Sequence, residues 1–178
     1  MKNANTVSAA AALLVLLGAS ACGTRGPSDS ADAKKGFSDH FPISVGGHVV
    51  SLQVALTDGE QHRGLMQRPD LGKDEGMIFV QAAPQRQNYW MKDCPEALDI
   101  AFAGKDGVIA EIYPLYPNDL RTVSSISDRL QYAVELPQGW FAANGVRPGA
   151  PIDLDQVEAA IKARGFDPAR FGFRDAQP

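Results

Sequence analysis

The sequence lacks the motifs that mark most enzymes and metal proteins. It has no glycine-rich phosphate loop, no Gly-x-Ser-x-Gly and no Cys-x-x-Cys pair. Its three histidines are scattered at positions 40, 48 and 62, whereas a zinc site needs three or four converging ligands. No catalytic set is assembled in the sequence, and neither a metal nor a cofactor is expected.

Cysteine and positive charge are also scarce. The chain has two cysteines, Cys22 and Cys94, and 17 basic against 21 acidic residues, which gives a net charge of −4. No basic stripe is present, and this argues against nucleic-acid binding. If Cys22 is lipidated, no intramolecular disulfide can form, and Cys94 is expected to be a small buried thiol.

Residues 1–21 have the form of a signal peptide. Lys2 provides a positive charge, residues 9–17 are apolar, and small residues lead to Cys22. The apolar run is shorter than the roughly 20 residues that span a bilayer as a helix, and small residues fit a processing site. The segment from Leu17 to Cys22 resembles a bacterial lipobox, with Ala19 in place of the usual branched aliphatic residue.

The sequence therefore predicts an exported protein that is anchored to a bacterial membrane through lipidated Cys22. Its domain would lie in the periplasm or outside the cell. Two or more acyl chains are enough for stable anchoring. The alternative is a secreted protein whose mature chain happens to begin at Cys22.

The rest of the chain divides into a tether, a domain and a tail. Residues 22–41 contain almost no aliphatic side chains, so they are expected to form a flexible tether that spans on the order of 25 Å. Residues 42–165 have the size of one domain. Residues 166–178 are expected to be a loosely docked C-terminal tail.

Alternating apolar residues predict a mainly β domain. Val50, Leu52 and Val54 alternate with less apolar neighbours, as in a half-buried strand, and residues 77–80 are apolar on both faces, as in an interior strand. Several short strands separated by Gly and Pro turns favour an antiparallel sandwich or barrel. Further strands are expected at 88–92, 98–103, 108–113 and 131–136, with a hairpin turn at 104–107.

Two helices are expected beside the strands. Thr57 and Glu60 have the spacing of a capping box, which predicts one short helix after the first strand. A C-terminal helix from Asp155 to Gly165 would bury a stripe that contains Val157.

The best candidate binding residues lie between positions 61 and 102. In an extended strand Asn88, Trp90 and Lys92 share one face. An aromatic ring flanked by an amide and an ammonium group is a usual lining for a small polar ligand. The alternative is that Trp90 fills the core.

Three charged residues could complete such a site. Arg63 and Arg68 offer planar guanidinium groups that suit a carboxylate or a phosphate. Asp99 points away from its apolar strand neighbours and could pair with one of these cations. The alternative is that all three only form ion pairs within the fold.

The same region carries motifs that occur in this order in a known family. From about His48 to Leu154 the chain resembles DUF192, a bacterial and archaeal domain of unknown function. The resemblance implies a compact, mainly β domain and implies no reaction. It is carried by residues 63–66, 76–79, 89–92 and 98–100, and by the later segments 132–137 and 149–151.

These observations favour one function and leave two alternatives open. The first is an envelope lipoprotein whose non-enzymatic β domain binds a small polar or glycan-like ligand. The second is a structural or partner-binding module. The third is a hydrolase that acts on cell-wall or saccharide material through Asp74, Asp99 or Glu135, which would require two carboxylates roughly 5–9 Å apart.

Overall fold

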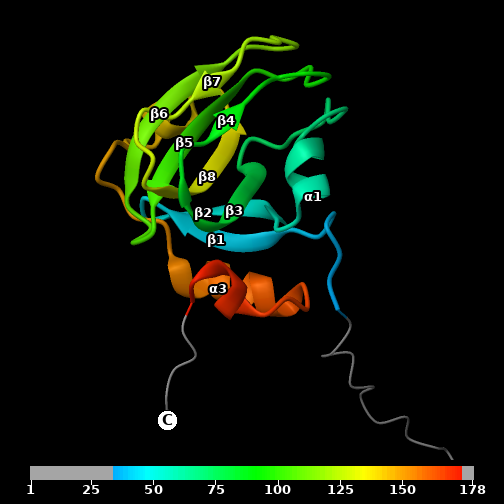
Figure 1. The fold of residues 1–178 in the computed structure, drawn as a ribbon. Helices are drawn as coiled ribbons and strands as arrows, with labels where there is room; N and C mark the ends of the chain where they lie inside the picture. The colour runs from blue at the N-terminus through cyan, green and yellow to red at the C-terminus, as the bar shows by residue number, and fades with distance from the viewer. Residues whose placement is uncertain (1–33, 174–178) are drawn as a thin grey trace, which may run out of the picture. The chain divides into compact units, whose positions relative to one another are not determined.

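A six-stranded sheet forms the centre of residues 34–173, the part of the chain that the computed structural model describes (Figure 1). The strand order is β1-β2-β3-β8-β5-β6. A second, two-stranded sheet pairs β4 with β7. The mainly β class is therefore confirmed. The strands are β1 (Phe41–Val45), β2 (His48–Ala55), β3 (Glu75–Gln85), β4 (Asn88–Tyr89), β5 (Leu98–Gly104), β6 (Ile109–Leu115), β7 (Val123–Ser124) and β8 (Leu130–Pro137).

The prediction was an antiparallel sandwich or barrel; the large sheet is mixed and open, which corrects the purely antiparallel pairing and the barrel. β2 and β3 run parallel, whereas every other neighbouring pair in this sheet is antiparallel. β1 and β6 are its two edges among the described strands, so the sheet does not close. The parallel pair is possible because residues 56–74 form a long crossover that contains α1 (Asp58–Arg63). The hairpin turn at 104–107 is confirmed, since the Gly107 N–H donates to the Gly104 carbonyl.

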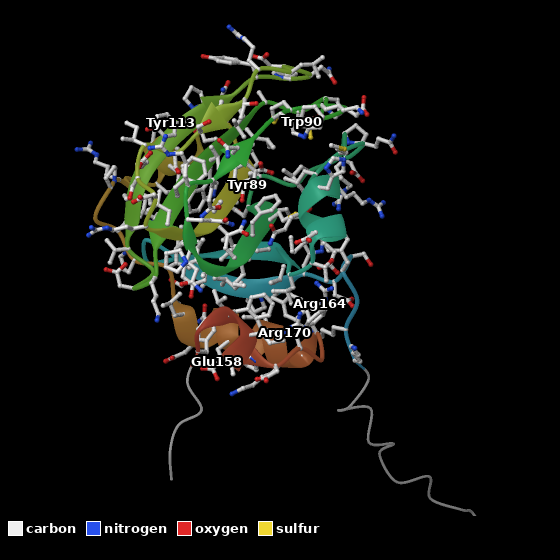
Figure 2. All side chains as sticks on the ribbon, viewed as in Figure 1. Tyr89, Trp90, Tyr113, Glu158, Arg164 and Arg170 are labelled. Atoms are coloured by element: carbon white, nitrogen blue, oxygen red, sulfur yellow. The ribbon has the colours of Figure 1, made fainter. Side chains whose placement is uncertain are left out.

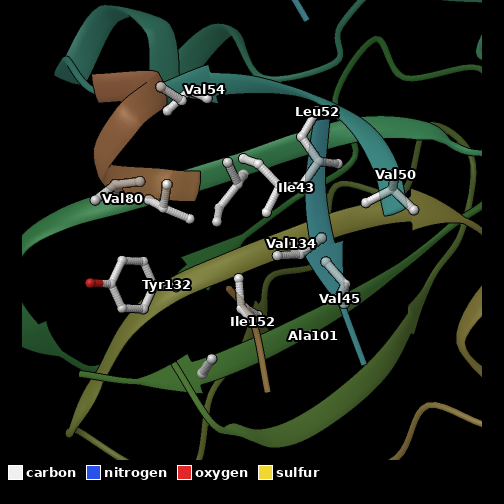
Figure 3. Close-up of a cluster of buried hydrophobic side chains, with 14 of the residues drawn as sticks. Ile43, Val45, Val50, Leu52, Val54, Val80, Ala101, Tyr132, Val134 and Ile152 are labelled. Carbon is white, nitrogen blue, oxygen red and sulfur yellow. The ribbon is translucent and has the colours of Figure 1, made fainter. Parts of the chain in front are cut away.

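One face of the sheet is covered by α3 (Leu154–Ala163). Its buried stripe of Val157, Ala160 and Ile161 joins a continuous apolar core with the side chains of the central strands (Figure 3). The stripe is as predicted, but the helix begins earlier than expected. Its N-cap is Asp153, whose side chain accepts from the Gln156 N–H at 3.1 Å.

The segments on either side of this domain pack more closely than expected. Residues 168–171 form a 3-10 helix, and Phe171 is buried in the core under α3. The Phe171 carbonyl accepts from the Gln131 side chain at 2.7 Å. At the other end, the Lys35 N–H donates to the Ala163 carbonyl at 3.0 Å. Residues 34–41 of the expected tether and residues 166–173 of the expected tail therefore belong to the folded unit.

The opposite face of the sheet is covered by loops instead of a long helix. Phe79, Ile100 and neighbouring side chains pack there against Leu65, Met91 and Cys94. Cys94 is buried, as predicted for a small structural thiol. No helix of residues 34–173 is both long enough and apolar enough to cross a membrane.

Two sets of interactions fix the first turn of α1: a capping box and an ion pair with α3. The predicted capping box is confirmed, with Thr57 and Glu60 exchanging hydrogen bonds. Glu60 also forms an ion pair with buried Arg164 at the end of α3, and Arg164 donates to the Val54 carbonyl. This pair fixes the position of α1, whose last turn carries His62 and Arg63.

Candidate functional site

A cavity of about 380 Å³ opens on the face of the sheet opposite α3. It lies between α1, the end of β3 and the short strand β4. Exposed residues form its mouth: His62, Arg63, Asn88 and Trp90. Buried residues form its floor: Phe79, Gln87, Cys94 and Glu135.

Trp90 lies at the mouth and does not fill the core. It is 38% exposed, whereas the other tryptophan, Trp140, is 6% exposed. The centroid of the Trp90 ring is 6.1 Å from that of the His62 ring and 5.6 Å from the Lys92 ammonium nitrogen. These contacts leave part of the ring surface exposed; Figure 2 labels Trp90 and Tyr89, its neighbour in the chain.

The segment that carries Trp90 keeps the alternation expected of a strand although the strand itself is short. β4 ends at Tyr89, because the Met91 N–H donates to the Asp119 carbonyl and not to a neighbouring strand. Asn88, Trp90 and Lys92 are nevertheless all exposed, and Met91 is buried. Two of the three predicted residues, Asn88 and Trp90, line the cavity, and Lys92 contacts the Trp90 ring.

The structure brings together only part of the predicted set. Arg63, Asn88 and Trp90 line the cavity, and Lys92 adjoins it through the Trp90 ring. Arg68 lies elsewhere, where it donates to Gln53 at 3.1 Å and pairs with Asp70 at 3.5 Å.

Asp99 also lies outside the cavity. Its neighbours Leu98 and Ile100 pack on the cavity face of β5, so Asp99 points to the other face. There it accepts from the Gly139 N–H at 2.8 Å. Burial raises the pKa of Asp99, while the bond from Gly139 acts in the opposite direction. Asp99 thus supports the backbone at Gly139.

Glu135 is the residue of the cavity that sequence reasoning did not assign to binding. It lies on the cavity face of β8 and is 4% exposed, and its carboxyl group has no hydrogen bond or ion pair within residues 34–173. Burial raises the pKa of its carboxyl group to about 8, so the group is largely protonated at neutral pH. Its backbone is fixed by close contact with β3, since any side chain at Gly76 would collide with the Glu135 carbonyl oxygen.

Two further polar side chains, Tyr89 and Gln87, line the same cavity. The Tyr89 hydroxyl donates to Gln87 Oε1 at 2.9 Å, and burial together with the nearby Glu135 charge raises the pKa of Tyr89 far above its usual range. Gln87 is 3% exposed and its Nε2 atom has no partner among the described residues. Its backbone is held by Ser125, whose hydroxyl accepts from the Gln87 N–H at 3.0 Å.

Cys94 completes the floor but is poorly suited to act as a nucleophile. Burial, followed by the charges of Glu135 and Asp93, raises the pKa of its thiol to about 12. A reactive cysteine needs the thiolate form at ambient pH. Cys94 therefore contributes packing at this position.

The mouth carries more positive than negative charge. The Arg63 side chain has no ion pair or hydrogen bond within the described part of the chain. Arg86 also lines the cavity and donates to the Ile126 carbonyl at 2.9 Å. Asp58, in the first turn of α1, is the one acidic residue among the exposed residues that line this cavity.

Comparisons with known proteins agree with this fold. Residues 41–154 match the family DUF192, described as an uncharacterized ACR. The chain is similar to a protein of unknown function from Novosphingobium aromaticivorans DSM 12444, with 33% identity and a TM-score of 0.61 over 64% of this chain and 84% of that one. It is also similar to a protein from Sinorhizobium meliloti 1021 described as a "putative transcription regulator", with 25% identity and a TM-score of 0.63 over 67% and 96% of the two chains. No curated protein matches the sequence.

Proposed function

This chain belongs to the DUF192 family, and we propose that it is an envelope lipoprotein whose β domain binds a small polar or glycan-like ligand. The proposal rests mainly on one observation: the partly exposed Trp90 ring stands at the mouth of a cavity of about 380 Å³. Ligand cavities usually have a volume of about 300–1,000 Å³ and combine an apolar wall with a few polar groups.

Each residue of the mouth has a distinct part in this binding mode. The open part of the Trp90 ring offers a flat apolar surface for the C–H face of a sugar or a similar ring. Asn88 Oδ1 already accepts from the Ser124 hydroxyl at 2.7 Å, so Asn88 offers its amide nitrogen as a donor. The Arg63 guanidinium can donate two parallel hydrogen bonds to an acidic group. His62 and Lys92 keep the Trp90 ring oriented.

A hydrolase is the second candidate because the Glu135 carboxyl group lines the cavity and burial raises its pKa to about 8, and a general acid works best with a pKa near the working pH. Of the three carboxylates considered from the sequence, Glu135 alone lines the cavity. Asp74 accepts from the Trp140 indole at 3.0 Å, and Asp99 is bonded to Gly139. A second carboxylate for hydrolysis would therefore have to be Asp58. Release of reducing sugar from cell-wall material by the wild type, and its loss in Glu135→Gln, would favour this candidate over simple binding.

The binding proposal is tested with the purified full chain. Native mass spectrometry of the wild type should detect a co-purified small molecule that is absent from Trp90→Ala. Tyr116→Ala is the matched control, because Tyr116 is another exposed aromatic residue, 54% exposed, that does not line this cavity. Retention of the same molecule by Trp90→Ala would remove the proposal and favour the structural or partner-binding module.

The anchoring proposal rests on sequence, because residues 1–33, which include Cys22, lie outside the described part of the chain. We expect Cys22→Ser to move the protein from the membrane to the soluble fraction, since lipidation would no longer occur. Cys94→Ser is the control and should remain in the membrane fraction. Recovery of unacylated wild type in the soluble fraction would contradict the anchor.

A further inference from the structure

The floor of the cavity holds two buried polar groups that have no partner among residues 34–173. One is the Glu135 carboxyl group, which meets neither a cation nor a hydrogen-bond donor there. The other is Gln87 Nε2, which donates to nothing. Buried polar groups in native proteins are nearly always paired. Two unpaired groups in one cavity indicate that a ligand supplies the missing partners.

The two groups need different hydrogen-bond partners. A buried carboxylate is stabilised most by a positively charged donor, because a charge-assisted hydrogen bond is roughly twice as strong as a neutral one. Gln87 Nε2 is an amide donor and needs an acceptor oxygen. Tyr89 interacts with both residues: its hydroxyl donates to Gln87, and burial together with the Glu135 charge raises the pKa of Tyr89. A matching ligand therefore carries an ammonium group beside an oxygen.

We infer that the cavity takes an amino sugar, whose ammonium group pairs with the Glu135 carboxylate and whose neighbouring hydroxyl accepts from Gln87 Nε2. This inference rests on the proposed binding function and names its ligand class. The Trp90 platform favours a sugar ring over a smaller amino alcohol, because a pyranose has an apolar face that can lie on an indole. At neutral pH the Glu135 carboxyl group is largely protonated, and an N-acetylated sugar lacks the positive charge that would favour its ionised form.

The groups that face the Glu135 side chain do not supply this charge themselves. Tyr89 from β4 and Cys94 from the following loop are neutral acids at this position. His62 and Arg63 line the exposed mouth, and neither forms an ion pair with Glu135. The positive partner is therefore assigned to the ligand.

The test compares three sugars that differ only at carbon 2: D-glucosamine, N-acetyl-D-glucosamine and D-glucose. Each is titrated into the purified full chain at pH 7, and binding is followed by calorimetry and by the NMR signal of the Trp90 indole N–H. We expect glucosamine to bind about tenfold or more tightly than the other two, as expected of a charge-assisted bond in place of a neutral one. A β-1,4-linked glucosamine trimer forms a second arm. Tighter binding of the trimer supports a glycan chain as the source, and equal binding supports the free sugar.

Two variants make the result specific to the floor. Glu135→Gln should lower the affinity for glucosamine about tenfold and leave glucose unchanged, because only the charged partner is lost. Gln87→Met should weaken all three sugars, because each has a neighbouring hydroxyl. Equal losses for glucosamine and glucose in Glu135→Gln would indicate a purely structural role for Glu135 and overturn the inference.

The outcomes also separate this inference from the proposed function. If glucose binds as tightly as glucosamine and binding depends on Trp90, the amine assignment is wrong and the polar-ligand site stands. If none of the sugars shifts the Trp90 signal, the amino-sugar inference is overturned. In that case the comparison of co-purified molecules in the wild type and Trp90→Ala decides whether the binding function fails as well.

Discussion

The two faces of the central sheet differ in how they are covered. The face under α3 is closed by an apolar core in which Leu52, Val134 and the stripe of α3 are fully buried. The opposite face is also largely apolar, but it contains the cavity with Glu135 and Gln87 on its floor. An unpaired buried polar group lowers stability. The unpaired groups of Glu135 and Gln87 therefore lower the stability of the cavity face, and a ligand that paired with them would restore it.

The two tryptophans show the same contrast in single residues. Trp140, at the start of α2 (Trp140–Ala143), is 6% exposed and its indole N–H donates to Asp74 at 3.0 Å. Its ring also packs edge-on against Phe141, with a centroid distance of 5.4 Å. Trp90 is 38% exposed and contacts mainly polar rings and cations. One ring is part of the core, and the other stands at the mouth of the cavity.

The largest expected effect comes from removing the buried ring. Trp140→Ala should lower the free energy of unfolding by about 3–5 kcal/mol, because it creates a large cavity and leaves Asp74 without its donor. Urea denaturation measures the change. Trp140→Phe should recover most of the packing but not the hydrogen bond. A loss below about 1 kcal/mol in Trp140→Ala would mean that this ring does not belong to the core.

Truncation of one core residue on each face tests whether both faces carry the fold. Leu52→Ala on the α3 face and Ile100→Ala on the cavity face should each cost about 2–5 kcal/mol, because both side chains are fully buried. Val49→Ala is the control, since Val49 neighbours Val50 on β2 but is 65% exposed. Wild-type stability in Ile100→Ala would show that the cavity face contributes little to the fold.

Glu135→Gln should instead raise the free energy of unfolding relative to the wild type, and this gain should grow as the pH rises above about 4.5. The pKa of Glu135 is about 8 in the folded protein and about 4.5 when exposed, so the folded state holds a proton that the unfolded state loses between these values. Wild-type stability therefore falls as the pH rises from 4.5 to 8. The variant has no such titration, and its stability relative to wild type should increase by about 2–4 kcal/mol across this window.

Denaturation with urea at pH 4.5, 6 and 8 measures this effect. Glu111→Gln is a control of opposite sign. Burial alone would raise the pKa of Glu111, but bonds from Ile126, Ser127 and Tyr113 lower it overall. Its stabilising contribution is present above the usual pKa of a glutamate and is lost on acidification. A Glu135→Gln variant whose stability follows the wild type at every pH would show that this carboxyl is not buried in a neutral form.

The sequence predicted the facing of the strands well, because side chains alternate between the two faces with a period of two. Val50, Leu52 and Val54 were expected to face the core and residues 77–80 to lie in an interior strand, and all of them are buried. The direction of strand pairing was not predictable in this way. The alternation in β2 is the same whether its neighbour runs parallel or antiparallel, and the crossover through α1 decides between them.

The candidate site was predictable only at its mouth. Asn88, Trp90 and Lys92 were expected to share one side. Asn88 and Trp90 line the cavity, and Lys92 contacts the Trp90 ring. The place of Glu135 in the cavity was not predictable. The other face of its strand is also apolar, and a local pattern of residues does not show that both faces of a strand are covered. Arg68 and Asp99 were grouped with the site because of their charge, but their nearest partners, Gln53 and Gly139, are distant in sequence.

The smallest expected effect on stability belongs to the residue with the largest expected effect on binding. Trp90→Ala should change the free energy of unfolding by less than about 0.5 kcal/mol, as is usual for exposed positions, because its ring loses few apolar contacts. The same change should abolish ligand binding as measured by calorimetric titration. Differential scanning calorimetry of the ligand-free protein measures the first quantity and titration measures the second. Lys92→Met is the paired control: it removes the charge beside the ring, keeps most of the side-chain length, and should weaken binding less. A loss of several kcal/mol in Trp90→Ala would make Trp90 a core residue like Trp140 and would remove the contrast between the two faces.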